Sequence, residues 1–357
     1  MARATTATIH LDALRHNLAR IRQAAPHSKV MAVVKADGYG HGLERVAKTL
    51  QSADAFGVAS LSDALRLRQA GLSQKIVLLS GFDEFSDIRL LRELSVDTVI
   101  HHHFQVQLLK QDAGSPLNVW LKMDSGMHRL GFSPNEFADV YQQLKALPNV
   151  SDDILLMSHF ASSDELLNPQ TTQQMDCFDL HVPLTTTSIS LANSAAILSW
   201  PSAHRGWVRA GGALYGLSVA AGKTGADFGL KPAMSLTTRL ISTKWVEQGE
   251  RIGYSGTYLC PERMLVGVAA IGYGDGYPRN IKQGTPALVN GQRMPIIGRV
   301  SMDLMALDLR ALPNARIGDV VTLWGEGLAI EEIADSANTI SYELTCSITR
   351  RVQFKEI

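Results

Sequence analysis

Short apolar runs alternate with amphipathic segments through the first two-thirds of the chain. The segments between the runs have helical spacing of apolar residues, for example at 62–71, 133–147 and 168–182. The runs themselves are mostly uniformly apolar, which is typical of parallel strands buried on both faces. They number eight, at residues 29–36, 55–60, 75–81, 97–102, 118–125, 153–160, 188–194 and 207–212. This pattern predicts a (β/α)8 barrel, and a doubly wound parallel sheet is the alternative that periodicity leaves open.

One further strand, at residues 5–10, comes before the eight and has no helix ahead of it. Leu11, Leu14, Leu18 and Ile21 follow it at spacings of three and four, which predicts a helix. We expect this first strand to lie outside the barrel and to pair with the C-terminal domain.

The pattern changes near Phe228, after which strand-like segments follow one another with little helix between them. Turn signals at Asn290-Gly291 and Gly318-Asp319 separate some of them. Only residues 329–338 have a helical pattern. The strand-like segments are 233–246, 264–273, 285–291, 294–300, 304–309 and 319–327. We therefore predict an α/β protein with two domains, the barrel at 1–228 and a mostly-β domain at 229–357.

Composition narrows the class of protein. Of 357 residues, 45% are hydrophobic and 19% charged, which fits a globular protein with a large core. The net charge is zero, so the nucleic-acid and anionic-membrane classes are not expected. No secretory signal and no apolar run of about 18 residues occurs. Three widely separated cysteines, Cys177, Cys260 and Cys346, favour reduced thiols in the cytoplasm over a disulfide or zinc site.

Polar residues gather where the predicted barrel strands end, which is where barrel enzymes carry their chemistry. Lys35 follows three apolar residues and precedes three glycines, and we expect its amine to be desolvated and able to form a Schiff base. A lysine at a strand end that extends toward solvent is the ordinary alternative. The other such residues are Lys122, Asp124, Arg129, Ser158, His159, Asn193, Ser194 and Arg209.

Three of the later residues suggest a phosphate site. Ser194 fits the N-cap of the helix that begins after the seventh strand, and Gly211 and Gly212 allow close backbone approach. Arg209 precedes the glycine pair and faces either a ligand or a structural ion pair. The triplet at residues 101–103 consists of three histidines, but neighbouring strand residues point to opposite faces. We interpret it as a solvated strand end and expect no metal.

A reactive lysine on the first barrel strand, a phosphate site after the last two and a β domain suggest an enzyme that uses pyridoxal 5'-phosphate (PLP). "VVKADGYGHG" resembles the PLP-lysine segment of bacterial alanine racemases. So do "LKMDSGMHRLGF", "SHFASSDE", "WVRAGGALYG", "IGYSGTY", "AIGYGDGYPR", "GRVSMDL" and "ISYEL", in the family's order over nearly the whole chain.

The resemblance implies roles for the residues at the cofactor. Lys35 would hold PLP as a Schiff base, and Arg209 would face its pyridine nitrogen. Lys122 is similar to a lysine that is carbamylated in the family and orients Arg129, which would contact the cofactor's phenolic oxygen and the substrate carboxylate. The remaining cofactor contacts would come from Tyr39, His159, Asn193, Ser194, Gly211, Gly212 and Tyr342.

The resemblance also implies a homodimer with shared active sites. Tyr254 would be the second catalytic residue, supplied across the interface, and His159 would link it to Arg209. Tyr273, Met302 and Asp303 would line the substrate side. The chemistry agrees, because racemisation needs a base on each face of Cα, and Lys35 and Tyr254 can serve as the two.

The expected function is interconversion of L-alanine and D-alanine, for peptidoglycan synthesis. A racemase of broader specificity, including serine, is the first alternative. A decarboxylase on the same architecture is the second, and Arg209 argues against it because an acidic residue is usual at the pyridine nitrogen. A PLP-binding regulatory protein is the third, and the β domain with Tyr254 argues against that.

Overall fold

The protein is described here by a computed structural model that covers residues 5–182 and 188–357. Its chain forms two compact units. One consists of Leu14–Leu214 with Val219–Lys223, and the other of the segment up to Ala13 with Tyr215–Ser218 and Thr224–Ile357. The second unit therefore takes up chain from Tyr215 onward, ahead of residue 229. Among the described residues no helix is long and apolar enough to cross a membrane.

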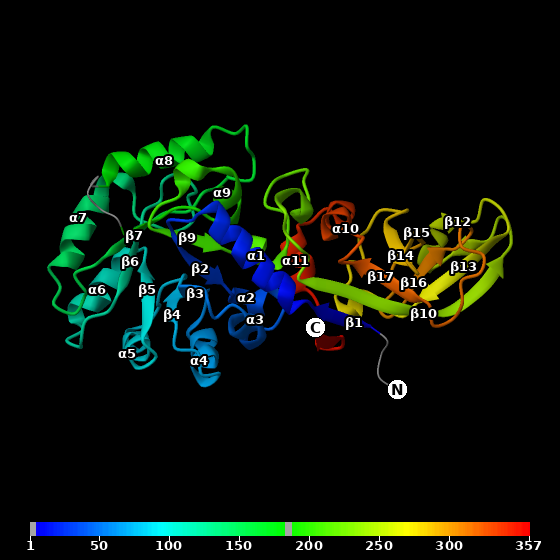
Figure 1. Cartoon of the computed structure of the whole chain (residues 1–357), viewed down its shortest axis with the longest axis horizontal. Coiled ribbons are helices and arrows are strands. Elements are labelled where there is room, and N and C mark those ends of the chain that lie inside the picture. Colours follow the sequence, from blue (N-terminus) through cyan, green and yellow to red (C-terminus); the bar gives the residue numbers. More distant parts are fainter. Residues whose placement is uncertain (1–4, 183–187) are drawn as a thin grey trace. The chain divides into compact units, whose positions relative to one another are not determined.

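The first unit is a closed barrel of eight parallel strands, so the barrel prediction is confirmed and the doubly wound alternative is wrong (Figure 1). Each strand pairs with its sequence neighbour, and β9 closes the ring on β2. The strands are β2 (Lys29–Val33), β3 (Ala55–Val58), β4 (Lys75–Leu78), β5 (Val96–Ile100), β6 (Val119–Lys122), β7 (Leu155–Met157), β8 (Ile189–Ser190) and β9 (Trp207–Ala210).

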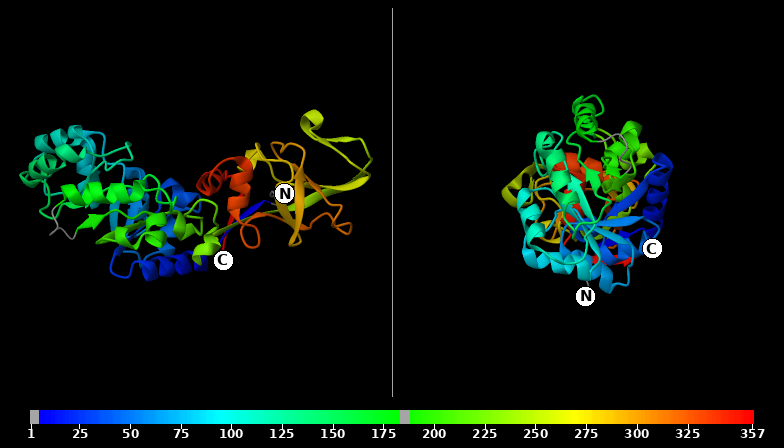
Figure 2. Two further views of the ribbon diagram at one scale, coloured as in Figure 1. Left: turned by 90° about the horizontal axis from the view of Figure 1, so that it is seen from above. Right: turned by 90° about the vertical axis from the view of Figure 1, so that its left-hand side faces the viewer.

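Helices surround these strands (Figure 2, right). Several begin as their sequences predict: the Ser60 side chain accepts from the Asp63 backbone N–H at the start of α4, and Pro134 opens α7. The helices are α1 (Leu11–Ala24), α2 (Lys35–Tyr39), α3 (Leu43–Thr49), α4 (Leu61–Gln69), α5 (Phe85–Glu93), α6 (His103–Gln111), α7 (Pro134–Lys145), α8 (Gln170–His181) and α9 (Ser194–Ser199), with 3₁₀ turns η1 (Pro201–Ala203) and η2 (Gly212–Tyr215).

The second unit is mostly β. Its main sheet has the strand order β13-β16-β15-β14-β17-β10-β1-β18, and a further pairing of β10 with β13 closes six of these strands into a ring. The strands are β1 (Thr6–Ile9), β10 (Met234–Val246), β11 (Arg251–Ile252), β12 (Tyr258–Leu259), β13 (Met264–Ala269), β14 (Pro286–Val289), β15 (Gln292–Ile297), β16 (Met305–Asp308), β17 (Val320–Trp324) and β18 (Gln353–Glu356).

The N-terminal strand β1 belongs to this second sheet. It pairs antiparallel with β10 and parallel with β18, so a short segment from each end of the chain completes the sheet. The described part of this unit also contains the α-helices α10 (Ile330–Ala337) and α11 (Ser341–Cys346) and the 3₁₀ turns η3 (Gly225–Phe228), η4 (Tyr254–Gly256) and η5 (Tyr273–Asp275). The expectation of one helical segment after residue 228 was therefore wrong, because α11 has only six residues, too few to show a period.

Candidate active site

The pleat of the barrel strands brings basic side chains to one level at the mouth. Side chains alternate along a strand, so residues two positions apart share a face. The interior core includes Val99, Trp120, Met157 and Trp207. The residues two positions further along these strands are His101, Lys122, His159 and Arg209. Four strands therefore direct nitrogen-bearing side chains toward the barrel axis, just above an apolar core.

Arg209 is the most enclosed of these residues, with 4% of its surface exposed. Its Nη1 donates to the Ser190 carbonyl at 2.9 Å and to the Ser190 hydroxyl at 2.7 Å, and its Nη2 donates to the Ser158 carbonyl at 2.7 Å. Burial lowers its pKa to about 10, so the guanidinium stays charged at neutral pH. Its hydrogen bonds to the described residues all come from Nη1 and Nη2, which leaves the Nε–H for a ligand.

His159 is held in one tautomer by Arg209. Nη2 of Arg209 lies 3.1 Å from Nδ1 of His159, and because a guanidinium can only donate, Nδ1 accepts and the ring proton is on Nε2. Burial lowers the pKa of His159 well below its ordinary value, and the neighbouring cations Arg209 and Lys122 lower it further. The imidazole is therefore neutral, with an Nε2–H available as a donor.

Lys122 is a buried lysine, 7% exposed. Burial lowers its pKa to about 8, and the positive charges of Arg209 and Arg129 act in the same direction. At pH 7 about one-tenth of this amine is therefore unprotonated and nucleophilic, far more than for an ordinary lysine. Asp124 is the nearby carboxylate that opposes the shift, but one of its oxygens already accepts the N–H groups of residues 126, 127 and 128.

Lys35 differs from the expectation. It begins α2 directly after strand β2 and its residue is exposed in the chain alone, so the prediction of a desolvated Lys35 was wrong. The buried lysine of the mouth is Lys122. The backbone after Lys35 is unusual: Ala36, Asp37 and Tyr39 all have φ near +53°. A left-handed turn of this kind costs about 1–2 kcal/mol for each residue with a Cβ, and it aims Tyr39 back beneath the mouth.

Tyr39, Ser194 and Gly211 converge on one point. A Cβ at Gly211 would lie 2.7 Å from the Tyr39 hydroxyl and 3.8 Å from Ser194 Oγ, so only glycine leaves this space open. Ser194 Oγ accepts from the Gly211 N–H at 2.8 Å and the Ala213 N–H at 3.3 Å. Two hydroxyls and adjacent backbone N–H groups thus form a small polar cradle.

Ser194 was expected to cap helix α9, and this was wrong. The cap is Asn193, whose side-chain oxygen accepts from the Ala196 N–H at 3.1 Å and from the Ser163 hydroxyl at 2.8 Å. Asn193 therefore fixes the start of α9, and the hydroxyl of Ser194, the first helical residue, is free to point at Gly211. Gly212, directly after Gly211, begins the 3₁₀ turn η2.

The histidine triplet also differs from the expectation of a solvated strand end. His102 caps helix α6 by accepting from the Phe104 N–H, and the exposed His103 pairs with Glu136 at 2.7 Å. His101 is half-buried at the mouth, and its position two residues after the core residue Val99 was the signal that could have found it.

The remaining barrel residue, Arg129, is exposed in the loop after β6, in the segment that Asp124 organises. It is close enough to Lys122 and His159 to lower the pKa of both. Its guanidinium has no hydrogen bond to any of the described residues, so it is available to an anionic ligand.

The other predicted residues lie in the β-rich unit, several of them on neighbouring loops. Tyr254, Tyr273 and Met302 are 67%, 40% and 51% exposed. The Tyr273 N–H donates to the Ser301 carbonyl at 3.1 Å, which brings the loops of Tyr273 and Met302 together. Asp303 accepts a short hydrogen bond from Arg351. Tyr342 is half-buried on helix α11.

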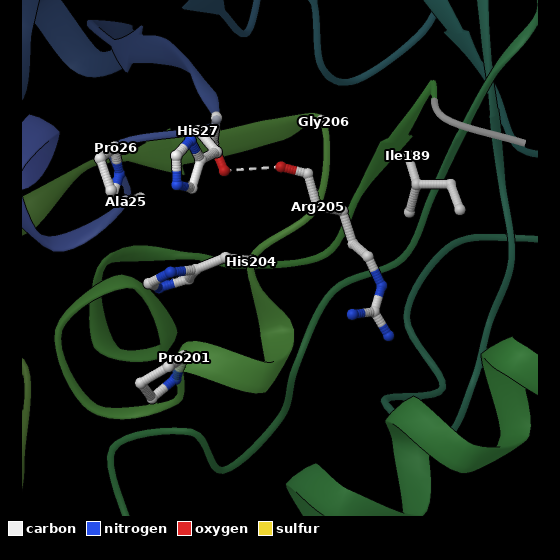
Figure 3. Close-up of a pocket in the computed structure, with 9 residues that line it drawn as sticks. Ala25, Pro26, His27, Ile189, Pro201, His204, Arg205 and Gly206 are labelled. Atoms are coloured by element: carbon white, nitrogen blue, oxygen red, sulfur yellow. Dashed lines mark hydrogen bonds between the residues drawn. The ribbon is translucent and has the colours of Figure 1, made fainter.

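Figure 3 shows the residues that line a cavity of about 500 Å3 in the barrel unit. Residues 25–28 precede β2 and residues 204–206 precede β9, so its walls belong to the N-terminal ends of the strands. His27 and His204 line it, while the Arg205 side chain points away from both and pairs with Asp179 at 2.9 Å. This cavity is therefore separate from the cluster of basic side chains.

Known proteins resemble this chain over its whole length. Residues 9–219 match the family model "Alanine racemase, N-terminal domain" and residues 233–355 match "Alanine racemase, C-terminal domain". A protein of Shewanella sediminis named alanine racemase is 49% identical over 347 residues, which is 97% of each chain. Another with that name, from Nitrosococcus oceani, is 50% identical with the same coverage.

Solved structures agree. The crystal structure of the biosynthetic alanine racemase from Pseudomonas aeruginosa superimposes with a TM-score of 0.96 at 44% identity, covering 99% of both chains. The alanine racemase of Acinetobacter baumannii gives a TM-score of 0.91 at 35% identity, covering 99% of this chain and 100% of that one. Matches to both halves and to complete relatives leave one conclusion: the chain belongs to the alanine racemase family.

Proposed function

We propose that this protein interconverts L-alanine and D-alanine with PLP, using Lys35 and Tyr254 as the two bases. The observation that carries the proposal is that Lys122, His159 and Arg209 lie at one level above the barrel core. They are next to the cradle formed by Tyr39, Ser194 and Gly211. The identities of 49–50% with relatives named alanine racemase favour alanine over the broader amino-acid range.

The residues at the mouth fit PLP. Its phosphate needs several donors in a small space, and the cradle offers the hydroxyls of Tyr39 and Ser194, while the absence of a side chain at Gly211 leaves room for the group. Its pyridine nitrogen needs one donor, and the Nε–H of Arg209 is available. Its negative charges would offset the positive charges of Arg209 and Arg129, which lower the pKa of Lys122 and of His159. We assign Tyr342 to the phosphate as well, and Asn193 to holding α9 in place.

When bound, PLP supplies an electron sink that acidifies the Cα–H of the amino acid. Arg209 keeps its proton, because its pKa of about 10 lies well above neutral pH. It can therefore donate a hydrogen bond to the ring nitrogen but does not readily protonate it. An electron sink whose ring nitrogen is not protonated is weaker. A weaker sink favours rapid return of the proton to Cα over side reactions such as transamination.

The two bases work on opposite faces of Cα. In our proposal the Lys35 amine removes or returns the proton on one face, and the Tyr254 phenolate does so on the other. Neutral His159 carries its proton on Nε2 and can donate it to the Tyr254 oxygen, while Arg209 holds the other ring nitrogen. Such a bond stabilises a phenolate and lowers the pKa of the tyrosine.

In this proposal Arg129 binds the substrate carboxylate and Lys122 positions Arg129. In the same proposal the neutral Lys122 amine attacks CO2: a C–N bond forms, one C–O π pair moves onto oxygen, and Nζ passes one proton to solvent water. The resulting carbamate has one negative charge and replaces a cation beside Arg129 and Arg209. It would orient the Arg129 guanidinium, which then holds the carboxylate and the cofactor's phenolic oxygen.

We further propose a homodimer in which each site is completed by the partner subunit's Tyr254, Tyr273, Met302 and Asp303. The high exposure of Tyr254 and Met302 in the single chain supports this. The same proposal places the enzyme in the cytoplasm, where D-alanine would be consumed in peptidoglycan synthesis.

The test is racemisation with exchange at Cα. The purified PLP-loaded enzyme should convert L-alanine to D-alanine, measured by chiral chromatography, and should exchange Cα–H for deuterium in D2O. Tyr254→Phe should lose exchange with one enantiomer and keep it with the other. Tyr258→Phe, a tyrosine of the same unit, is the control and should behave as wild type. A protein that binds PLP without converting alanine would contradict the function, and turnover of L-serine as fast as L-alanine would favour the broader racemase.

A further inference from the structure

His101 and Lys122 are neighbours at the ends of adjacent parallel strands. The last paired residues of β5 and β6 are Ile100 and Leu121. Both side chains that follow lie two positions beyond interior core residues, Val99 for His101 and Trp120 for Lys122. Paired positions in neighbouring strands are about 4.8 Å apart, so the two side chains leave the barrel wall side by side on its inner face.

The His101 ring is fixed by the loops around it. Nε2 of His101 lies 2.8 Å from the Ser80 carbonyl, and the His101 backbone N–H donates to Gln105 Oε1 at 2.8 Å. A Cβ at Gly81 would lie 3.1 Å from the ring, so the glycine admits it. Because a carbonyl only accepts, Nε2 carries the ring proton and Nδ1 of His101 is unprotonated and able to accept a hydrogen bond.

Lys122 lacks an acceptor of its own. Its side-chain nitrogen has no hydrogen bond to any of the described residues, although the residue is 7% exposed. The other charged groups that influence it are Arg209, Arg129 and Lys35, which are cations and cannot accept, and Asp124, whose oxygens are engaged in its own loop. Burial, with a contribution from the charge of Lys122, also lowers the pKa of His101, which keeps Nδ1 unprotonated.

We propose that His101 is a positioning residue: its Nδ1 accepts the single N–H of the Lys122 carbamate and thereby turns the two carbamate oxygens toward Arg129. This rests on the carbamylation proposed above. Once CO2 is attached, Nζ keeps one hydrogen, held in the plane of the carbamate. An acceptor on that hydrogen fixes the plane and hence the direction of both oxygens.

Two variants separate this role from the bond between His101 and Ser80. In His101→Asn the side-chain oxygen takes the place of Nδ1 and the contact with Ser80 is lost. In His101→Gln the amide N–H₂ takes the place of Nε2, keeps that contact and removes the acceptor. Both are compared with wild type as PLP-loaded enzymes, with thermal unfolding as the check on folding.

The readouts are the carbamate carbonyl signal in 13C NMR with 13C-bicarbonate and the KM for L-alanine. Wild type and His101→Asn should show the signal at similar bicarbonate concentrations. His101→Gln should need about 10-fold more bicarbonate and have a raised KM at low bicarbonate, recovered when bicarbonate is in excess.

Any other pattern of results would contradict the inference, and the patterns differ in whether they also contradict the carbamylation. A carbamate signal unchanged in His101→Gln overturns it alone, as does a loss confined to His101→Asn, which would assign the effect to the Ser80 contact. A wild type without any carbamate signal overturns the carbamylation and this inference together, while the racemisation assay still decides the proposed function.

Discussion

Replacing Gly211 by alanine tests whether the cradle is as tight as its geometry implies. The new Cβ would lie 2.7 Å from the Tyr39 hydroxyl, 0.7 Å inside the 3.4 Å at which ordinary contact begins. Gly211 has an ordinary φ, so no backbone strain is added. Tyr39 is 9% exposed and sits in the left-handed turn, so its ring cannot swing aside. Overpacking of this kind costs about 1–3 kcal/mol.

The same geometry predicts that a second substitution relieves the first. In Gly211→Ala with Tyr39→Phe, the nearest ring atom is the former Cζ, 3.4 Å from the new Cβ, which is ordinary contact. The double variant should therefore regain most of the free energy of unfolding lost by Gly211→Ala. For a unit of this size the single substitution should lower the Tm by about 2–12 °C.

Thermal unfolding by circular dichroism, with and without saturating PLP, measures this cycle. PLP affinity should behave differently from stability. Tyr39→Phe and the double variant both lack the hydroxyl that we propose binds the phosphate, so each should bind PLP about 10–100-fold more weakly. Tyr141→Phe, on helix α7, is the control for loss of a tyrosine hydroxyl. A double variant as unstable as Gly211→Ala alone would refute the close approach of Gly211 and Tyr39.

Two further substitutions probe the rest of the barrel unit. Burial lowers the pKa of His41 from 6.5 to about 4. Between these two pH values the unfolded chain binds more protons than the folded one. The free energy of unfolding should therefore fall by up to about 3 kcal/mol as the pH drops from 6.5 to 4. Urea unfolding should show a flatter pH dependence for His41→Gln, and parallel curves would contradict the assignment. Asp97, 5% exposed, accepts from Lys75 at 2.6 Å and from Trp120 Nε1 at 3.1 Å, so Asp97→Asn should cost about 3 kcal/mol in urea unfolding. The exposed Asp152→Asn should change stability by less than about 0.5 kcal/mol, and equal effects would argue against a buried network.

The barrel could be predicted because its signal is repeated. Eight apolar runs between amphipathic segments indicated a parallel α/β fold, of which the barrel was one form and the doubly wound sheet the other, and the polar residues at the end of each run indicated where the mouth lies. Lys122, His159 and Arg209 were found in this way, as polar residues directly after buried ones. The closed ring of the β-rich unit was not predicted, since the pairing of β10 with β13 depends on contacts between strands and leaves no periodic trace.

The errors at the site have physical causes as well. The left-handed turn after Lys35 was not predicted, because Ala36, Asp37 and Tyr39 have no local preference for positive φ strong enough to predict three such residues together. His101 was grouped with its two neighbours because they share a residue type, although only His101 continues the alternation of β5, whereas His102 caps helix α6 and His103 is its first residue. Because three identical residues stand in a row, the alternation of side-chain direction was overlooked there. The same alternation places Lys122 at the mouth on the next strand.

The net charge of the whole chain does not reveal that its candidate active site is basic. Lysine and arginine balance aspartate and glutamate at 34 each, yet four strands bring Arg209, Lys122, His159 and His101 to one level of a narrow barrel, with Asp124 already engaged in its own loop. Burial, and in second place the neighbouring positive charges, disfavours the protonated forms of Lys122 and His159, and both lower their pKa values. An anionic cofactor and a carbamate each offset part of this positive charge. The basic mouth is therefore poised for negative charge, and the same depressed pKa that makes Lys122 a weak cation makes its amine able to react with CO2.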